Sequence, residues 1–306
     1  MRTSAAPLIS IDSISKRYGS ETVVDKLSFG VEAGTITGFL GPNGAGKTTT
    51  IRILLGLASA SGGSATISGR RYEQLTAPAE SVGAMLDGAG FHPGRSGRNH
   101  LRYLAATAGI PASRVEEVLE MVEMKPAANK RVKGYSTGMR QRLGLAVALL
   151  GDPEVMILDE PANGLDPGGV RWLRDLLRDR AAQGATVLVS SHVLAEVAQT
   201  VDDVVVISKG RLIAQGPVEE LVASSEGAVV PVELACADQA TMAEALRAAE
   251  AEVTTTDDGG LLVVGMGAPE IGELALKQGI ALHRLAERRR SLEDAFLALT
   301  DGEGEL

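Results

Sequence analysis

One eight-residue segment of the chain combines residue types that together can hold a polyphosphate. It reads Gly-Pro-Asn-Gly-Ala-Gly-Lys-Thr and fits the spacing G-x-x-x-x-G-K-T of a phosphate-binding loop. Its three glycines let successive backbone N–H groups turn toward an anion. Lys47 offers a cation to the β- and γ-phosphates, and the hydroxyl of Thr48 can ligate Mg²⁺. We therefore expect a nucleoside triphosphate to be bound by Gly41, Pro42, Asn43, Gly44, Ala45, Gly46, Lys47, Thr48 and Thr49.

Two adjacent carboxylates, Asp159 and Glu160, end a short apolar run at 155–158. Such a run is typical of a strand buried on both faces, and strands of this kind end at the edge of a parallel sheet where ligands bind. Adjacent carboxylates repel each other unless a metal or a proton-transfer role stabilises them. Asp159 suits Mg²⁺ held through water, and Glu160 suits a general base acting on an attacking water. The alternative, a solvated acidic pair, is disfavoured by the phosphate loop.

Three further features could reach a nucleotide, although each also has a purely structural explanation. His192 follows an apolar strand at 186–190 and would lie at the same sheet edge as the two carboxylates, but a lone histidine there is usually structural. Ser136 occupies the cap position of a helix with Gly138 in its first turn, which offers a hydroxyl and N–H groups at a positive helix end. An ordinary capped helix explains this pair equally well. Tyr18 can stack on a base or simply pack.

The apolar runs indicate strands and helices that would place these residues around one sheet. Their alternation predicts an α/β fold. The phosphate loop lies between a strand at 35–40 and a helix at 48–57, as the motif requires. The other expected strands are 8–15, 23–31, 64–68, 82–86, 155–158 and 186–190, with a hairpin of 204–208 and 211–214; the other helices are 99–108, 113–124, 143–150 and 170–183. Ser113 is expected to cap its helix, with Glu116 three residues on.

The last quarter of the chain has a different pattern and no catalytic motif. Its expected order over 229–285 is strand, helix, strand, strand, helix, strand, as in a small ferredoxin-like unit. A closing helix is expected at 291–299. We therefore expect a nucleotide-binding domain at 8–223 with a helical insert at about 88–150, a linker at 224–228 and an accessory α+β domain at 229–300.

Composition narrows the possible partners. The chain of 306 residues has a net charge of −9, which argues against nucleic acid as a main partner. Cys236 is the single cysteine, so an intramolecular disulfide framework is excluded. No run approaches the ~18 apolar residues of a membrane span, and residues 1–7 lack the apolar core of a signal peptide. The expected location is the cytosol, with any membrane role depending on a partner chain.

Taken together, the motifs resemble those of one family. The chain is similar to the ATP-binding subunit of ATP-binding cassette (ABC) transporters over 8–223, through the phosphate loop, the segment 136–142, the pair Asp159–Glu160, Asp166 and His192 in this order. The resemblance implies a P-loop NTPase cassette in which 41–48 is the Walker A motif and 155–159 the Walker B strand. It makes Glu160 the catalytic glutamate and His192 the switch histidine that senses the γ-phosphate.

The resemblance also implies a second copy of the chain. The segment 136–141, with Ser136, Gly138 and Gln141, matches the signature motif, which in the family contacts the ATP bound by the other subunit. Asp166 matches the loop that communicates across the dimer, and Tyr18 the aromatic position that stacks on adenine. The expected assembly is a head-to-tail dimer that encloses two ATP with Mg²⁺.

Two positions depart from the family pattern. The usual signature is Leu-Ser-Gly-Gly-Gln, whereas this chain has Tyr-Ser-Thr-Gly-Met at 135–139, a form that resembles bacterial drug and antibiotic exporters of the ABC-2 type. Asp87 stands where the family usually places a glutamine that contacts Mg²⁺ and couples to the membrane subunit. We expect Asp87 to reach the metal through water and to tune Mg²⁺ binding or coupling.

The resulting expectation is an ATPase subunit of an exporter for drugs or antibiotics, docked on a polytopic permease at the cytoplasmic face of the membrane. A soluble ABC ATPase that remodels a protein assembly is the main alternative, disfavoured by the exporter-like signature and the lack of a second cassette. A regulatory switch that binds nucleotide without turnover is the other alternative, disfavoured by Glu160 and His192.

Overall fold

The computed structural model describes residues 7–86, 90–193, 199–224, 231–256 and 259–287. The chain divides into two compact units, Met1–Val218 and Glu219–Leu306. Each unit has its own hydrophobic core. The predicted closing helix at 291–299 lies outside the described residues.

A six-stranded sheet in the order β5-β6-β7-β3-β8-β9 forms the centre of the first unit. Its strands are β3 (Ile36–Leu40), β5 (Val82–Met85), β6 (Val155–Asp159), β7 (Thr186–Ser191), β8 (Asp203–Ser208) and β9 (Arg211–Pro217). Neighbours from β5 to β8 pair in parallel, and β9 closes an antiparallel hairpin with β8. Every residue of β3, β6 and β7 is buried, as expected for parallel strands covered on both faces. The predicted α/β fold is confirmed.

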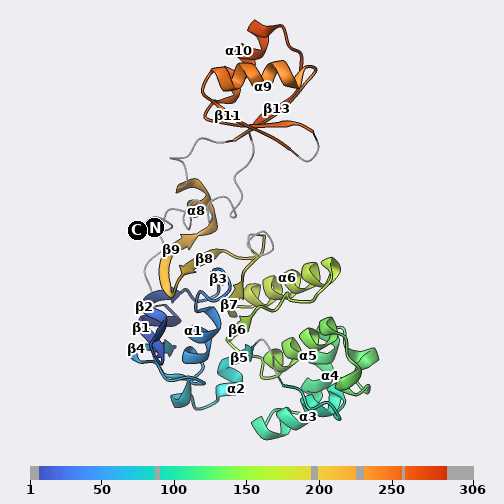
Figure 1. Cartoon of the computed structure of the whole chain (residues 1–306). Coiled ribbons are helices and arrows are strands. Elements are labelled where there is room, and N and C mark those ends of the chain that lie inside the picture. The colour runs from blue at the N-terminus through green and yellow to red at the C-terminus, as the bar shows by residue number, and fades with distance from the viewer. Residues whose placement is uncertain (1–6, 87–89, 194–198, 225–230, 257–258, 288–306) are drawn as a thin grey trace. The chain divides into compact units, whose positions relative to one another are not determined.

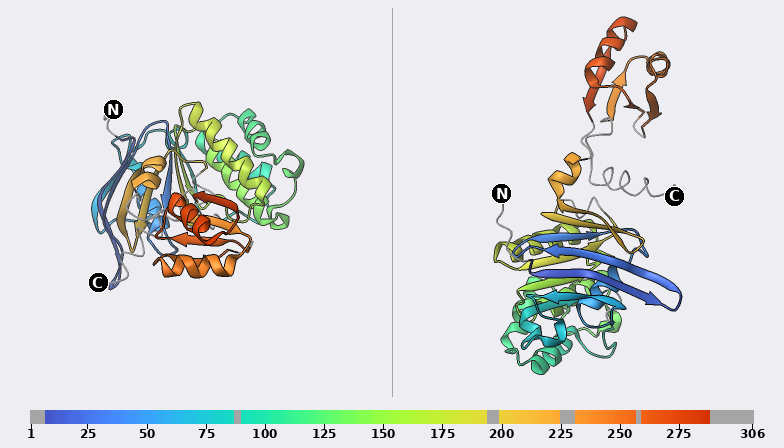
Figure 2. Two further views of the ribbon diagram at one scale, coloured as in Figure 1. Left: turned by 90° about the horizontal axis from the view of Figure 1, so that it is seen from above. Right: turned by 90° about the vertical axis from the view of Figure 1, so that its left-hand side faces the viewer.

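A second, antiparallel sheet in the order β2-β1-β4 packs beside the first. Its strands are β1 (Ile9–Tyr18), β2 (Glu21–Val31) and β4 (Gly62–Ile67), and β1 and β2 form the long hairpin seen in the right-hand view of Figure 2. Helix α1 (Lys47–Leu54) lies between the sheets, in contact with β2 and β4 on one side and β6 on the other (Figure 1). Helix α6 (Pro167–Ala182) covers the other face, against β3 and β7.

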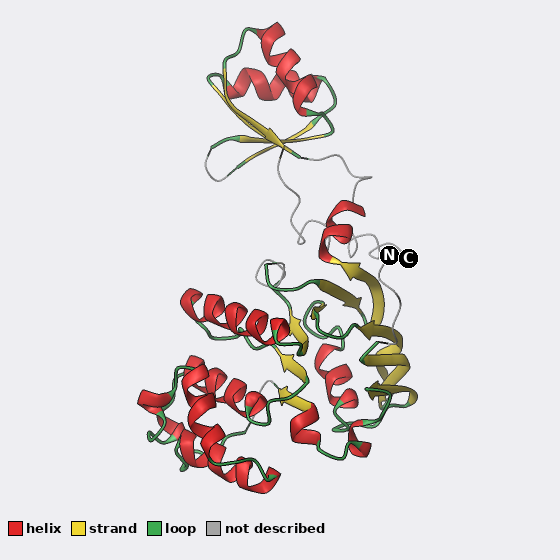
Figure 3. Cartoon of the chain, turned by 180° about the vertical axis from the view of Figure 1, so that it is seen from behind, coloured by secondary structure: helices red, strands yellow, loops and turns green. Residues whose placement is uncertain are grey.

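The insert between β5 and β6 forms a helical cluster at one end of the central sheet (Figure 3). It contains α3 (Gly97–Ala108), α4 (Ser113–Met121) and α5 (Thr137–Leu149), which contact one another, and α5 also packs on β5. A short helix, α2 (Pro78–Ser81), precedes β5. The predicted cap at Ser113 is wrong, because Ala112 already has αR backbone angles and Ser113 is the first helical residue. The turn begins earlier, where the N–H of Arg114 donates to the carbonyl of Pro111.

The second unit has the predicted order of strands and helices. After α8 (Val218–Ser224) come β10 (Val232–Cys236), α9 (Gln239–Ala248), β11 (Glu252–Thr255), β12 (Leu261–Val264), α10 (Ala268–Gln278) and β13 (Leu282–Glu287). The strands form an antiparallel sheet in the order β11-β12-β10-β13, with both helices on one side (Figures 1 and 3). This is a ferredoxin-like arrangement. Among the described helices of the whole chain, none combines the length and apolar character needed to span a bilayer.

Candidate active site

The phosphate-loop segment joins the buried strand β3 to the N-terminus of α1. Gly46 is the cap residue of α1 with φ of 102°, and Gly44 has φ of 84°. Side chains rarely adopt these angles, and a Cβ on Gly46 would also lie 2.9 Å from the carbonyl oxygen of Val23. The glycines therefore permit a turn that directs the free N–H groups of the α1 N-terminus toward the end of the sheet, a geometry suited to an anion.

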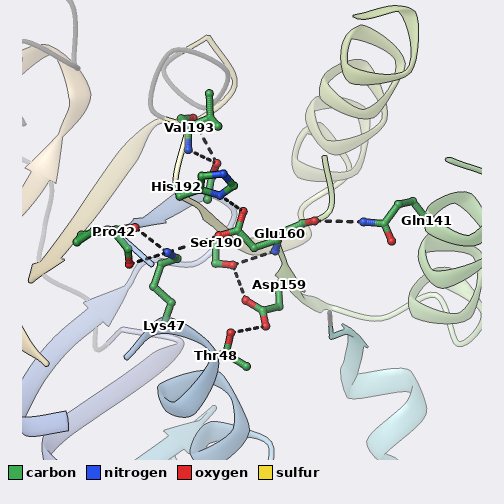
Figure 4. Close-up of polar contacts among 11 residues, drawn as sticks. Pro42, Lys47, Thr48, Gln141, Asp159, Glu160, Ser190, His192 and Val193 are labelled. Atoms are coloured by element: carbon green, nitrogen blue, oxygen red, sulfur yellow. Dashed lines mark hydrogen bonds and ion pairs between the residues drawn. The ribbon is translucent and has the colours of Figure 1, made fainter. Parts of the chain in front are cut away.

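The side chain of Lys47 is held by hydrogen bonds to backbone carbonyl groups of the loop. Its Nζ donates to the carbonyl oxygen of Gly41 over 2.6 Å and to that of Pro42 over 3.3 Å (Figure 4). The same Nζ lies 3.5 Å from Oε1 of Glu160, and the Lys47 side chain is only 6% exposed. The cation is thus fixed between the loop and the carboxyl end of β6.

Asp159, the last residue of β6, is fully buried and accepts two hydroxyl hydrogen bonds. Thr48 Oγ1 donates to Oδ2 over 2.8 Å, and Ser190 Oγ donates to Oδ1 over 2.6 Å (Figure 4). Ser190 also accepts a 2.9 Å hydrogen bond from the backbone N–H of Glu160. One serine therefore positions both carboxylate-bearing residues.

Sequence reasoning missed Ser190. The sequence placed Ser190 at the end of the expected strand 186–190, as Asp159 follows the expected strand 155–158. In the structure, Asp159 and Ser190 are directly paired in the parallel register of β6 and β7. Only that pairing, which the sequence does not state, makes the hydroxyl a neighbour of the carboxylate.

Glu160 follows β6 with φ of 50°, a left-handed angle that is uncommon for a residue with a side chain. Its Oε2 lies 2.8 Å from Nδ1 of His192, which comes directly after β7 (Figure 4). The carboxylate is 12% exposed and the imidazole 37% exposed. The structure thus brings Lys47, Glu160 and His192 together at one edge of the sheet.

The predicted signature residues lie at the start of α5. Ser136 is the cap of α5 and accepts a 3.2 Å hydrogen bond from the N–H of Met139, as its sequence position predicts. Gln141 reaches the site, because its Nε2 donates to the carbonyl oxygen of Glu160 over 3.2 Å. A Cβ on Gly138 would lie 3.4 Å from the carbonyl oxygen of Gly164, so this helix end adjoins the loop before α6.

Asp166 and Tyr18 have surroundings of their own. Asp166 caps α6 by accepting a 2.7 Å hydrogen bond from the N–H of Gly169, and α6 consequently begins at Pro167, earlier than predicted. Tyr18 ends β1 and is 51% exposed, with Nζ of Lys16 4.8 Å from its ring centroid. Asp87 lies outside the described residues.

Comparison with known proteins places the chain in a family. Residues 24–163 match the family described as ABC transporter, and residues 231–293 match one described as a domain of unknown function. The uncharacterized ABC transporter ATP-binding protein YdbJ of Bacillus subtilis is 35% identical over 302 residues, covering 97% of this chain and 96% of that protein.

Two further relatives have names that state a transport role. The bacitracin transport ATP-binding protein BcrA of Enterococcus faecalis is 33% identical, covering 97% of both chains. The Nod factor export ATP-binding protein I of Burkholderia lata is 36% identical, covering 97% of this chain and 99% of the relative. Among solved structures, an ATP-binding subunit of an ABC transporter superposes with a TM-score of 0.66 at 27% identity, covering 72% of this chain and 93% of that one. The chain therefore belongs to the family of ABC transporter ATP-binding proteins and is an ATPase of the ABC type.

Proposed function

We propose that this ATPase powers a separate, polytopic membrane permease of an exporter and works as a head-to-tail dimer with a second copy of itself. Each of two ATP molecules would be held by the phosphate loop of one copy and by Ser136 and Gly138 of the other. Tyr18 would stack on the adenine, and Asp166 would carry the state of one site to the other. The permease would hold the cassette at the cytoplasmic face of the membrane.

The observation that carries the proposal is the position of the Glu160 carboxylate between Lys47 and His192. One carboxylate oxygen lies 3.5 Å from the lysine Nζ and the other 2.8 Å from the histidine Nδ1. A carboxylate beside the cation of a phosphate loop can accept the proton of a water that attacks the γ-phosphate. Lys47 and the loop N–H groups would bind the phosphates, while His192 would orient Glu160 and contact the terminal phosphate.

Thr48 and Asp159 fit a Mg²⁺ site. Their hydroxyl and carboxylate oxygens lie 2.8 Å apart, and the buried carboxylate would be stabilised by a cation. Within the described residues no three His, Cys, Asp or Glu side chains form a complete metal site. Phosphate and water oxygens would therefore complete the octahedral shell that Mg²⁺ prefers. Bound Mg²⁺ would offset the negative charge of the β- and γ-phosphates; Asp87 remains a predicted outer contact.

The proposed cargo is a drug or an antibiotic. Support comes from the Tyr-Ser-Thr-Gly-Met signature at 135–139 and from relatives named for bacitracin transport. Relatives named for Nod factor export show that a similar cassette can serve a different cargo. Identifying the permease, which would enclose the cargo, would decide between these two kinds of cargo.

Glu160→Gln tests the catalytic assignment. Loss of a general base typically costs ~10²–10⁴-fold in rate, whereas ATP binding should persist because the phosphate loop is intact. We expect ATP turnover to fall by this amount and an ATP-bound dimer to accumulate in size-exclusion chromatography. Glu154→Gln, an exposed residue just before the same strand, is the matched control and should be active. A monomeric Glu160→Gln variant with full turnover would exclude the proposed mechanism.

The same variant tests the permease. Tagged Glu160→Gln protein at native expression would be crosslinked with ATP present, fractionated, and its partners identified by mass spectrometry. A polytopic membrane protein in near-equal amount supports the exporter. A purely cytosolic dimer with no membrane partner would support the remodelling ATPase instead, and wild-type protein without turnover would support the regulatory switch.

A further inference from the structure

The helical insert carries a positive charge that the rest of the chain does not share. Residues 90–150 contain ten Lys and Arg and four Asp and Glu, a net charge of +6. The whole chain has a net charge of −9, so the remainder carries −15. Such segregation of charge points to an anionic partner for the positive part.

All four carboxylates of the insert are already paired. Glu116 pairs with Arg98, Glu117 with Arg114, Glu120 with Lys125, and Glu123 with Arg142. Six cations then remain without an ion pair or a side-chain hydrogen bond to the described part of the chain. We refer to these six as the basic face: Arg95, Arg102, Lys130, Arg131, Lys133 and Arg140.

Backbone contacts gather the basic face on one side of the insert. The loop before α3 runs beside the loop before α5, because Val132 N–H donates to the carbonyl of Arg95 and Lys133 N–H to that of Pro93. A bridge between Ser96 and Arg131 extends the pairing. A shallow groove between the loops is lined by Phe91, Pro93, Val132, Lys133 and Arg140.

Helix α3 connects the remaining members of the basic face. Arg98 donates its backbone N–H to the carbonyl of Ala128 and its Nη1 to Oδ1 of Asn129, so α3 lies beside the segment that leads to Lys130. Arg102 follows Arg98 by one helical turn and is exposed. These contacts bring together the segments of the insert that carry the six cations.

An exposed aromatic ring lies among these cations. Tyr103 is 52% exposed, and the Arg95 guanidinium stacks 4.3 Å from its ring centroid. Burial lowers the pKa of His100, and the positive charge of Arg95 lowers it further. Amphipathic rings beside Lys and Arg are typical of surfaces that meet lipid headgroups.

We propose that the basic face binds the phosphate headgroups of an anionic phospholipid leaflet. Unpaired cations spread over two loops and two helices suit a fluid array of phosphates, which needs no matched geometry, better than a single acidic peptide. Because the attraction acts within a Debye length of ~8–10 Å, the negative remainder of the chain does not cancel it. The biological setting rests on the proposed function, since a permease-bound cassette works at the membrane surface.

Co-sedimentation with vesicles tests the proposal on the full-length protein. The probes are vesicles of phosphatidylglycerol with phosphatidylcholine, and of phosphatidylcholine alone. Each Lys or Arg near an anionic surface contributes ~1 kcal/mol, so neutralising three should weaken partitioning by about 100-fold. The variant is Arg102→Gln, Lys130→Gln and Arg131→Gln together. Its matched control is Arg52→Gln, Arg70→Gln and Lys277→Gln, three exposed cations outside the insert.

We expect salt-sensitive binding of wild type and control to phosphatidylglycerol vesicles and loss of binding by the insert variant, with ATP turnover unchanged in all three proteins. Absence of binding by the wild type, or equal binding by both variants, would overturn the proposal. If the insert variant binds vesicles normally but no longer co-purifies with the permease, the basic face instead serves an acidic protein segment. Vesicle binding requires neither turnover nor a permease, so this test and that of the proposed function fail independently.

Discussion

The hydroxyl of Ser190 donates a 2.6 Å hydrogen bond to Oδ1 of Asp159, which is completely buried. The Ser190 Oγ also accepts a hydrogen bond from the backbone N–H of Glu160 over 2.9 Å. The serine therefore connects the proposed metal ligand and the proposed general base, although it needs to contact neither nucleotide nor water.

Ser190→Ala should damage catalysis more than nucleotide binding. It leaves a buried carboxylate oxygen and a backbone N–H without their partner, a loss of ~1–3 kcal/mol in the free energy of unfolding. We expect kcat to fall while KM for ATP changes little. Ser208→Ala is the control, since Ser208 is buried at the end of β8 in the same sheet and has no described side-chain hydrogen bond. Equal kcat values in the two variants would refute the positioning role.

Thr48 offers a test of the metal site. Thr48→Val keeps the shape of the side chain but removes the oxygen that lies 2.8 Å from Asp159 Oδ2. The Mg²⁺ concentration for half-maximal ATP turnover should rise at least tenfold, the effect of losing about 1.4 kcal/mol of binding free energy. Thr48→Ser retains the hydroxyl and should titrate like wild type. Identical Mg²⁺ curves for Val and Thr at this position would remove Thr48 from the site.

Gly83 tests how closely helix α5 of the insert packs against β5. An added Cβ would lie 1.9 Å from the carbonyl oxygen of Ala148 in α5, so Gly83→Ala must displace α5 from β5. Overpacking of this kind costs ~1–3 kcal/mol. Gly62→Ala meets no atom within 4 Å and should be neutral or slightly stabilising. Chemical unfolding would compare them, and a Gly83→Ala protein as stable as Gly62→Ala would contradict the packing.

The second unit should lose stability in acid through Asp238. Its carboxylate accepts from the backbone N–H of Thr241, and this bond, with that from the Thr241 hydroxyl, lowers its pKa. A depressed folded-state pKa gives stability above the unfolded pKa of about 3.9 that is lost as pH falls through the lower folded value. Asp238→Asn caps α9 without titrating.

The measurement is the unfolding midpoint of the second unit at pH 7 and at successively lower pH. As the pH falls below about 4, wild type should lose more stability than Asp238→Asn. Parallel curves for the two proteins would show that the Asp238 cap contributes nothing to the pH dependence.

Local motifs explain what the sequence could predict. The phosphate loop, the β6 strand and the Ser136 cap each depend on residues close together in the chain, so their spacing alone specifies them. The start of α6 at Pro167 was also readable, because Asp followed by Pro is a typical cap and first helical residue. The predicted helix of 170–183 began too late because that signal was not used.

Contacts between distant segments could not be predicted in this way. Ser190 meets Asp159 because β6 and β7 pair in one particular register. Gln141 donates to the carbonyl of Glu160 because the insert packs against that loop. Both contacts join segments whose separation in sequence carries no local signal, and only the assembled sheet brings them together.

The left-handed backbone at Glu160 sets stability against activity at a single position. A residue with a Cβ pays roughly 1–2 kcal/mol for this conformation, whereas glycine adopts it freely. Glu160→Gly should therefore yield a protein that melts at a higher temperature and hydrolyses no ATP. A laboratory selection for thermal tolerance alone would favour that inactive protein, so thermostable variants of this ATPase must be screened for turnover at every round.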